Sequence, residues 1–216
     1  MKQTAVEGMK KELETMAPRV KQVMKQTRAR VLHGDTHAEG KLVSVFEPTT
    51  EVIRRGKAKQ PTEFGKMIKV QEAERQIITS YEVFAKRPSD SELLVPAVEV
   101  HCERLGRVPE LVAADAGFYS AQGEKTAKEK GVKKVSVPNR STQSAERRKL
   151  QKTRWFKKGQ KWRTGCEGRI SVLKRRHGLN RCRYKGDDGM KIWVGLGVIC
   201  DNLITMGRYL DDKSEF

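Results

Sequence analysis

Four short apolar runs, separated by helical segments, constrain the fold of this chain more than any other feature. Proline, glycine or polar turn residues bound each run, and the runs occupy residues 67–70, 77–84, 110–114 and 132–137. The first two are close enough to form a hairpin. The last two alternate with helical patterns at 89–104 and 120–130, as in β-α-β units. The sequence therefore predicts an α/β fold, a mixed sheet flanked by helices.

The remaining segments are more polar. Residues 1–31 have helical spacing that Pro18 is expected to interrupt. Ser89 and Glu92 form a capping-box pattern at the start of the 89–104 helix. We expect a loop at 33–40, an extended run at 41–46, a basic connection at 54–65, and helices at 165–177 and 192–210. These patterns predict an N-terminal helical and loop segment, residues 1–40, and an α/β domain at 41–210.

Positive charge is concentrated in one segment. The chain has 45 Lys and Arg against 27 Asp and Glu, a formal net charge of +18. Between Arg140 and Gly186, seventeen Lys and Arg face only Glu146 and Glu167, so this segment alone has a net charge of +15. Trp155, Phe156 and Trp162 lie among these charges. Cations that neutralise phosphates, mixed with aromatic stacking faces, favour nucleic acid as the partner.

Several other classes are disfavoured. No apolar run approaches the roughly 20 residues of a membrane-spanning helix, and residues 1–31 lack the apolar region of a secretory signal. The four cysteines match no zinc spacing and predict reduced thiols. His33 and His37 flank Asp35, but the nearby glycines favour a loop over a metal site.

Two carboxylates stand where catalysis could occur. Asp115 directly follows the apolar run LVAA, and functional groups of α/β sheets gather at the carboxyl ends of strands. It could instead only cap the turn into the next helix. Glu167 lies within the basic segment, where Thr164 and Glu167 also fit a second capping box.

If the helix begins before Thr164, Arg163, Glu167 and Lys174 lie within about 40° of one another on its surface. Cys166, Ile170, Leu173 and His177 then mark the adjoining buried stripe. Cations beside a carboxylate suit a phosphodiester substrate and a hard divalent ion such as Mg²⁺. With Asp115, this pattern suggests two-metal phosphoryl transfer.

At these residues the sequence resembles the DDE transposases of bacterial insertion sequences, which have an RNase H-like catalytic domain. The resemblance spans about residues 31–210 and rests on GKAKQPTEFG, LVAADAGFYS, WFKKGQKWRTGCEGRISVLK and KRRHGLNRCRYKG. One branch of the family has the pattern Y-x2-R-x3-E-x6-K. Arg163, Glu167 and Lys174 match it, whereas Gln160 replaces the tyrosine.

The resemblance implies DNA transposition, in which a divalent ion, Mg²⁺ or Mn²⁺, supports cleavage at transposon ends and strand transfer into target DNA. It makes Asp115 and Glu167 the second and third catalytic acids and metal ligands. Expected DNA contacts are Lys161, Trp162, Arg163, Lys174, Arg175 and Arg176. It also implies a possible homodimer, no membrane, and a bacterial cytoplasmic protein associated with the nucleoid through DNA.

The first acid of such a triad has no good candidate. Asp35 is in a loop-like context, Glu47 is the wrong residue type for the family, and Asp90 is better explained as a helix cap. We therefore expect a C-terminal part of a longer transposase, an RNase H-like sheet without its first, central strand, and no cleavage by the isolated chain.

Three alternatives remain open at this point. The chain could be a catalytically dead DNA-binding fragment, a nuclease of RNase H-like fold without strand transfer, or a nonfunctional relic. Binding that survives EDTA and falls steeply with salt is the property expected of the first alternative.

Overall fold

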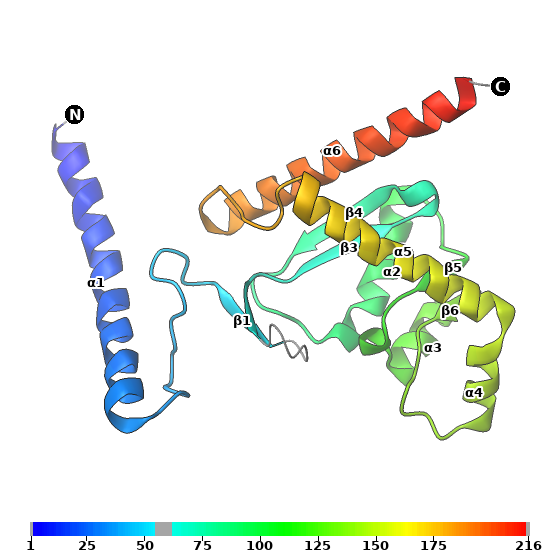
Figure 1. The fold of residues 1–216 in the computed structure, drawn as a ribbon, viewed down its shortest axis with the longest axis horizontal. Coiled ribbons are helices and arrows are strands. Elements are labelled where there is room, and N and C mark those ends of the chain that lie inside the picture. The colour runs from blue at the N-terminus through cyan, green and yellow to red at the C-terminus, as the bar shows by residue number, and fades with distance from the viewer. Residues whose placement is uncertain (1, 55–61, 215–216) are drawn as a thin grey trace. The chain divides into compact units, whose positions relative to one another are not determined.

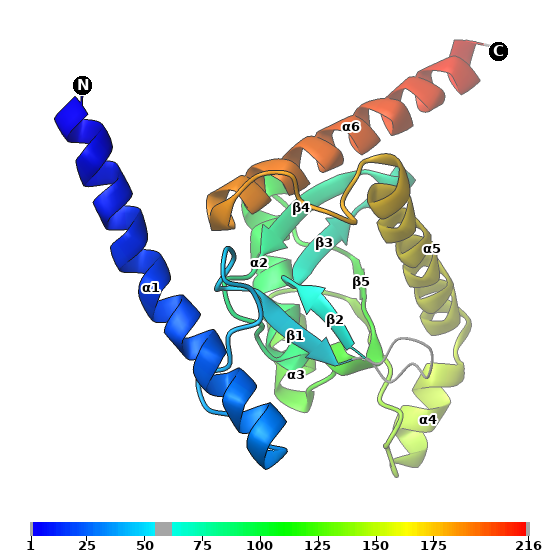
Figure 2. The same cartoon turned by 60° about the vertical axis from the view of Figure 1, so that its left-hand side comes forward.

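The structure is a computed structural model that describes residues 2–54 and 62–214. It contains two compact units, Met1–Lys66 and Met67–Phe216. The first unit contains helix α1 (Lys2–His33) and the antiparallel strands β1 (Glu51–Arg54) and β2 (Thr62–Gly65). Figures 1 and 2 show the elements of each unit. The predicted boundary at residue 40 stays a prediction.

Helix α1 continues through Pro18, so the predicted interruption is wrong. A proline removes one backbone hydrogen bond, and most of this helix is exposed to water, which can solvate the freed carbonyl. The loop after α1 is bound back to it: the Gln26 side chain donates to Leu42 O at 2.7 Å and accepts from Leu42 N at 2.8 Å. Residues 41–46 consequently form no strand.

The predicted connection at 54–65 contains half of a hairpin. Residues 62–65 form β2, which pairs with β1 from Glu51↔Gly65 to Arg54↔Thr62. The prediction of a connection is therefore wrong at 62–65. Residues 55–61, and with them most of the GKAKQPTEFG motif, lie outside the described residues.

The second unit contains the four predicted strands as two pairs. The antiparallel hairpin consists of β3 (Ile68–Glu72) and β4 (Ile78–Val83), with a register shift at Gln71 and Glu72. The parallel pair consists of β5 (Leu111–Ala113) and β6 (Lys134–Ser136). The predicted mixed α/β class is confirmed. Within the described residues, however, the pairs stay separate: β3 bonds only to β4, and β5 only to β6.

Five helices complete this unit: α2 (Leu94–Leu105), α3 (Ala121–Glu129), α4 (Ala145–Lys152), α5 (Arg154–Arg176) and α6 (Gly186–Ser214). Short 3-10 turns precede β4, α2 and α3, namely η1 (Glu74–Gln76), η2 (Asp90–Glu92) and η3 (Ala116–Phe118). Gly106, in the left-handed conformation at φ 64°, ends α2 as expected. Ser120 caps α3 through its bond to Gly123 N.

The predictions of capping boxes at Ser89 and at Thr164 are wrong. Ser89 bonds to Ser91 Oγ rather than to a backbone amide, and α2 begins only at Leu94. Thr164 lies in the middle of α5, where its hydroxyl donates to Gln160 O at 3.0 Å. Because α5 begins ten residues before Thr164, Glu167 is not at a helix N-terminus.

Two apolar clusters hold the second unit together. One joins α2 and α3 to the β5–β6 pair through Leu94, Val98, Ala127 and Val135. The other joins the β3–β4 hairpin to α5 and α6 through Ile78, Leu173, Val194 and Val198. Strand β6 alternates: Val135 packs in the first cluster, whereas the hydroxyl of the next residue, Ser136, donates to Phe156 O of α5 at 2.9 Å. Helices therefore cover both faces of β5–β6.

Among the described helices, α6 is long and apolar enough to cross a membrane by length and composition, over Gly186–Asp211. The expectation that no apolar run approaches the length of a membrane-spanning helix is therefore wrong for residues 186–211. The same composition is found in core helices of soluble proteins. One side of α6 indeed packs on the hairpin through Val194 and Val198 and includes the buried carboxylate of Asp201.

Candidate functional site

Asp115 lies at the carboxyl end of β5, where the chain turns into η3. Its Oδ1 accepts from Ala116 N at 2.9 Å, so it does cap the turn. Its Oδ2 lies 3.7 Å from Arg163 Nη1, and its side chain is 54% exposed. Asp115 can cap the turn and also belong to a site with Arg163, because Oδ1 accepts from the turn while Oδ2 faces the arginine.

Arg163 and Glu167 lie on successive turns of α5. Arg163 Nη1 donates to Glu167 Oε1 at 3.0 Å, and the same nitrogen forms the longer contact to Asp115. The structure thus brings together both predicted acids and the predicted arginine. Two contacts of 3.0 and 3.7 Å to one atom place the two carboxylate oxygens no more than about 7 Å apart.

Gln160 explains how α5 is seated beside Asp115. Its amide nitrogen donates to Ala114 O at 3.3 Å and to Ser136 Oγ at 3.1 Å, at the ends of β5 and β6. Gly159 allows the close approach, since an added Cβ would lie 2.8 Å from Ser136 Cβ. The glutamine that replaces the tyrosine of the transposase pattern therefore links the helix to both strand ends.

The donor chemistry of Asp115 and Glu167 fits a divalent cation, because both are exposed carboxylates and already share one positive group. The ligand set is small, however. Among the described residues, no group of three or more His, Cys, Asp or Glu side chains could hold a metal ion. Arg163 would also have to move aside.

Not all cations of the 140–186 segment are available for a ligand. Arg147 pairs with Glu124, donates to Val137 O at 2.7 Å and stacks over Tyr119. Arg169 is likewise buried, with 9% of its side chain exposed. By contrast Lys161, Arg175 and Arg176 are exposed, and Lys174 is half-buried.

The aromatic residues of this segment mostly face the protein. Phe156 is 3% exposed, which corrects its expected role as a stacking face for nucleic acid. Trp162 is half-buried and interacts with the Glu72 carboxylate. Beside Phe156 a cavity of about 430 Å³ opens, and its cationic lining consists of Arg140, Arg148 and Lys157.

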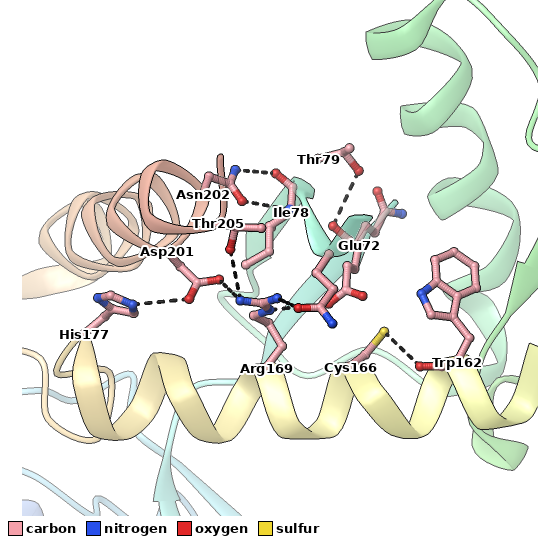
Figure 3. A network of polar contacts seen from close by, with 12 residues as sticks. Glu72, Ile78, Thr79, Trp162, Cys166, Arg169, His177, Asp201, Asn202 and Thr205 are labelled. Atoms are coloured by element: carbon pink, nitrogen blue, oxygen red, sulfur yellow. Dashed lines mark hydrogen bonds and ion pairs between the residues drawn. The ribbon is translucent and has the colours of Figure 1, made fainter. Parts of the chain in front are cut away.

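A buried polar network, not expected from the sequence, joins β3, α5 and α6 (Figure 3). Arg169 of α5 contacts Asp201 Oδ2 at 3.0 Å and Glu72 Oε2 at 3.7 Å. His177 Nε2 lies 3.3 Å from the other oxygen of Asp201. The side chains of Glu72 and Asp201 are only 4% and 3% exposed.

The network perturbs two ionisable groups. Burial raises the pKa of Glu72, although hydrogen bonding to Cys166 and the charge of Arg169 oppose the shift. Burial and the nearby Glu72 carboxylate raise the pKa of Cys166 to about 12. Oε2 of Glu72 is buried without a hydrogen-bond partner. The Cys166 thiol is consequently protonated and inert at neutral pH.

Asn202 binds α6 to the first residue of β4. Its side-chain oxygen accepts from Ile78 N at 2.9 Å, and its amide donates to Ile78 O at 2.8 Å. One signal in the sequence could have indicated this face: Asp201 and Asn202 interrupt the otherwise apolar run WVGLGVICDNLITM. The contact of Glu72 with Arg169 had no such signal, because the two are far apart in the chain.

The three residues considered as a first acid each take part in local structure. Asp35 caps a loop by accepting from His37 N at 2.7 Å. Glu47 follows a serine-capped turn, where its amide bonds to Ser44 Oγ at 3.0 Å. Asp90 lies at the start of η2, where its carboxylate faces Gly117 and is 3.6 Å from Arg87.

In the described stripe beside Glu167, Leu173 is buried and Cys166 and His177 are partly buried, as predicted. Ile170 is 42% exposed, so its prediction as a buried residue is wrong. Around the helix, Ile170 lies closer to Arg163 than to the buried Leu173.

Comparison with known proteins gives one match. Residues 120–207 match the family model of the transposase DDE domain. The match covers the segment from the start of α3 into α6, with Arg163, Glu167 and Lys174 inside it and Asp115 five residues before it. No curated protein and no solved structure matches the chain. The predicted resemblance is confirmed over the matched range.

Proposed function

Taking the transposase DDE domain of residues 120–207 as the premise, we propose that this chain acts in DNA transposition. It binds DNA and contributes Asp115 and Glu167 to metal-dependent cleavage and strand transfer at the ends of an insertion sequence. One observation carries the proposal: Arg163 contacts a carboxylate from a strand end and a carboxylate from a helix at the same time. A basic segment surrounds this pair.

Each residue of the pair has a separate task. The η3 turn holds one oxygen of Asp115 and leaves the other directed at Arg163. Gln160 anchors α5 to both strand ends, which fixes where Glu167 projects. Arg163 balances the two carboxylates, and its guanidinium could contact a phosphate of the DNA strand if the carboxylates held a metal ion instead.

DDE transposase domains generally use divalent metal ions, and we propose Mg²⁺ or Mn²⁺ held by Asp115 and Glu167. When bound, such ions would activate the attacking oxygen and stabilise the leaving one. Carboxylate oxygens are the donors these hard ions prefer. The small donor set within the described residues supports a further ligand from another acid.

DNA is the proposed partner of the basic segment. Lys161, Arg175 and Arg176 are exposed on α5. Arg163 and Lys174 lie on the same face of the helix as Glu167, whereas Arg176 lies on the opposite face. Cations in this position neutralise the phosphates on either side of a scissile bond. Trp162, half-buried beside Glu72, would contact DNA only with its exposed edge. Transposon ends and target DNA are the proposed substrates.

The first acid is proposed to come from a strand outside this chain, as expected for a C-terminal part of a longer transposase. The separate strand pairs support this proposal, since within residues 2–54 and 62–214 β3 and β5 each bond to one neighbouring strand. A strand between them would complete an RNase H-like mixed sheet in the order β4, β3, added strand, β5, β6. The proposed location is bacterial and cytoplasmic, at the nucleoid through DNA.

A second candidate function is a catalytically silent DNA-binding fragment. The lack of a three-carboxylate cluster among the described residues favours it over a complete nuclease. Such a fragment would bind DNA without a metal ion, because its affinity would come from phosphate contacts alone.

DNA binding is tested by fluorescence anisotropy with a short duplex in EDTA, over a series of salt concentrations. We expect steep salt dependence, and each of Lys161→Gln and Lys174→Gln should reduce the salt slope by about 1. Lys133→Gln is the matched control, because Lys133 is an exposed lysine outside the basic segment. Equal effects of all three variants would contradict a DNA site on α5.

Catalysis is tested with the DNA ends of the element that encodes the chain, in Mg²⁺ and in Mn²⁺. We expect no cleavage by the 216-residue chain, and cleavage and joining by a longer protein that supplies the upstream acid. Asp115→Asn and Glu167→Gln should abolish the activity of the longer protein. If both substitutions leave that activity intact, the assigned acids are wrong. If the 216-residue chain itself cleaves DNA and Asp115→Asn abolishes it, the first acid is already present.

A further inference from the structure

The loop between α5 and α6, residues 177–185, presents an aromatic ring to solvent. Tyr184 is 49% exposed, and its ring centroid lies 5.6 Å from that of Trp193, at a tilt of 58° between the two ring planes. The Trp193 ring is half-buried and supports Tyr184 from one side. Both residues follow α5 in the chain, so this pair is additional to the aromatic residues of α5 itself.

Contacts within the α5–α6 loop hold the Tyr184 ring in place. The Cys182 thiol donates to Tyr184 O at 3.2 Å. Trp193 Nε1 donates to Gly178 O at 3.1 Å. Gly189 allows the loop to lie directly on the first turn of α6, because an added Cβ there would lie 2.8 Å from Tyr184 Cβ. A ring that is already in place loses little conformational freedom when a ligand stacks on it.

The charge around this ring is positive. Residues 175–185 contain five arginines and lysines and no aspartate or glutamate. All five are exposed, namely Arg175, Arg176, Arg181, Arg183 and Lys185. Cations alone suit any polyanion, whereas cations around an exposed aromatic face suit nucleotides, which present both phosphates and bases.

We propose that Tyr184 is a stacking platform for an unpaired base of a DNA strand, and that Arg181, Arg183 and Lys185 contact the phosphates beside that base. A base inside a duplex is stacked on both faces, so a base must leave the stack before it can lie on a protein ring. The proposal rests on the proposed function in taking the strand to be DNA. It adds a preference for single strands, which phosphate contacts along α5 do not provide.

The position of the loop relates the platform to the carboxylate pair. From Glu167 to the last residue of α5, Arg176, the helix extends roughly 14 Å along its axis. Lys174 lies between them on the same face as Glu167. A strand that leaves the carboxylate pair along this face therefore runs toward the α5–α6 loop. The platform would hold an unpaired nucleotide of that strand beyond the end of the helix.

The test measures the binding of a labelled oligothymidine, which forms no duplex, and of a short duplex by fluorescence anisotropy in EDTA. Tyr184→Ala should raise the dissociation constant of the oligothymidine about fivefold or more and leave that of the duplex nearly unchanged. Tyr184→Phe keeps the ring and should bind like the unaltered chain. Phe46→Ala is the matched control, because Phe46 is an aromatic residue outside the loop that is 80% exposed. It should lose no affinity.

Salt dependence separates stacking from charge. Tyr184→Ala should lower the affinity for oligothymidine by the same factor at every salt concentration, because stacking releases no counterions. Arg183→Gln should instead reduce the salt slope by about 0.7, the value for one phosphate of a single strand. Circular dichroism verifies the fold of each variant. Tyr184→Leu, which keeps an apolar side chain against Trp193 but has no ring, replaces Tyr184→Ala if that variant unfolds.

The platform is overturned if removal of the ring leaves oligothymidine binding unchanged, if Tyr184→Phe loses as much affinity as Tyr184→Ala, or if duplex binding falls by the same factor. It fails separately from the DNA site on α5. If Lys161→Gln and Lys174→Gln reduce the duplex salt slope while the Tyr184 variants change nothing, the α5 site stands and the platform is wrong. The reverse result supports the platform and contradicts the α5 site.

Discussion

Replacing Arg169 with alanine should severely destabilise the second unit. Arg169 contacts two carboxylates, Glu72 and Asp201, whose side chains are 4% and 3% exposed. Without the guanidinium, both would be buried without their main compensating charge. Removing one partner of such a buried ion pair typically costs about 3–5 kcal/mol. We expect the free energy of unfolding at neutral pH to fall by about this amount.

The loss should depend on pH in a defined direction. Burial already raises the pKa of Glu72 in the folded chain above its usual value of 4.5. Arg169→Ala removes an opposing charge and raises it further. The folded state then binds more protons at Glu72 than the unfolded state, so the contribution of Glu72 to stability is fully present below pH 4.5 and is lost as the pH rises through the raised pKa. The cost of the substitution should shrink in acid.

Urea denaturation followed by circular dichroism, at a series of pH values, measures both effects. Arg175→Ala is the control, because Arg175 is exposed on the same helix. It should change stability by less than about 0.5 kcal/mol. The reasoning is refuted if Arg169→Ala costs no more than the control, or if its cost is the same at every pH. Asp201→Asn in the Arg169→Ala background should restore part of the loss.

Three further predictions concern β3, α5 and α6 and need only stability or labelling measurements. Glu72→Gln should flatten the decline in stability as pH rises above 4.5, because the carboxyl group with the raised pKa is removed. An unchanged pH profile in urea denaturation would contradict a raised pKa of Glu72. Gly159→Ala should destabilise by about 1–3 kcal/mol, since its Cβ would lie 2.8 Å from a β6 side chain. Gly165→Ala, with open space around it, should stabilise by about 0.5–1 kcal/mol, and the reverse order in thermal melts would refute this packing. A thiol reagent at pH 8 should modify the exposed Cys200 quickly and Cys166, with its pKa of about 12, slowly; mass spectrometry of the digested protein gives the two rates.

The order of elements was largely predictable. The strands at 78–83, 111–113 and 134–136 lie inside the predicted apolar runs, and the strand at 68–72 extends two residues beyond the run at 67–70. Short apolar runs between turn residues report burial locally. The helix ends at Gly106 and the start at Ser120 were also predicted, since caps depend on a few neighbouring residues. The extended run expected at 41–46 forms no strand, because the Gln26 side chain takes the backbone hydrogen bonds of Leu42.

Helix boundaries within the basic segment were less predictable. Gly159, Gly165 and Gly168 lower the helix propensity of residues 154–176, yet the structure has one continuous helix there. Packing of Phe156 and Leu173 against distant strands and helices stabilises it. Tertiary packing thus overrode the local preference.

Several features of the candidate site could be predicted from local sequence alone. These are the charge of the 140–186 segment, the positions of Asp115 and Glu167 in strand-end and helical contexts, and the common face of Arg163, Glu167 and Lys174, because each depends only on local spacing. The tertiary structure decided which groups meet: Asp115 with Arg163, Gln160 with two strand ends, and Glu72 with Arg169 and Asp201. It also decided that Arg147 and Arg169 are buried partners of acids rather than free cations. Burial and charge pairing depend on residues far apart in the chain, and only the packing of α5 on the strand ends, of α4 on α3, and of β3 with α5 and α6 brings these residues into contact.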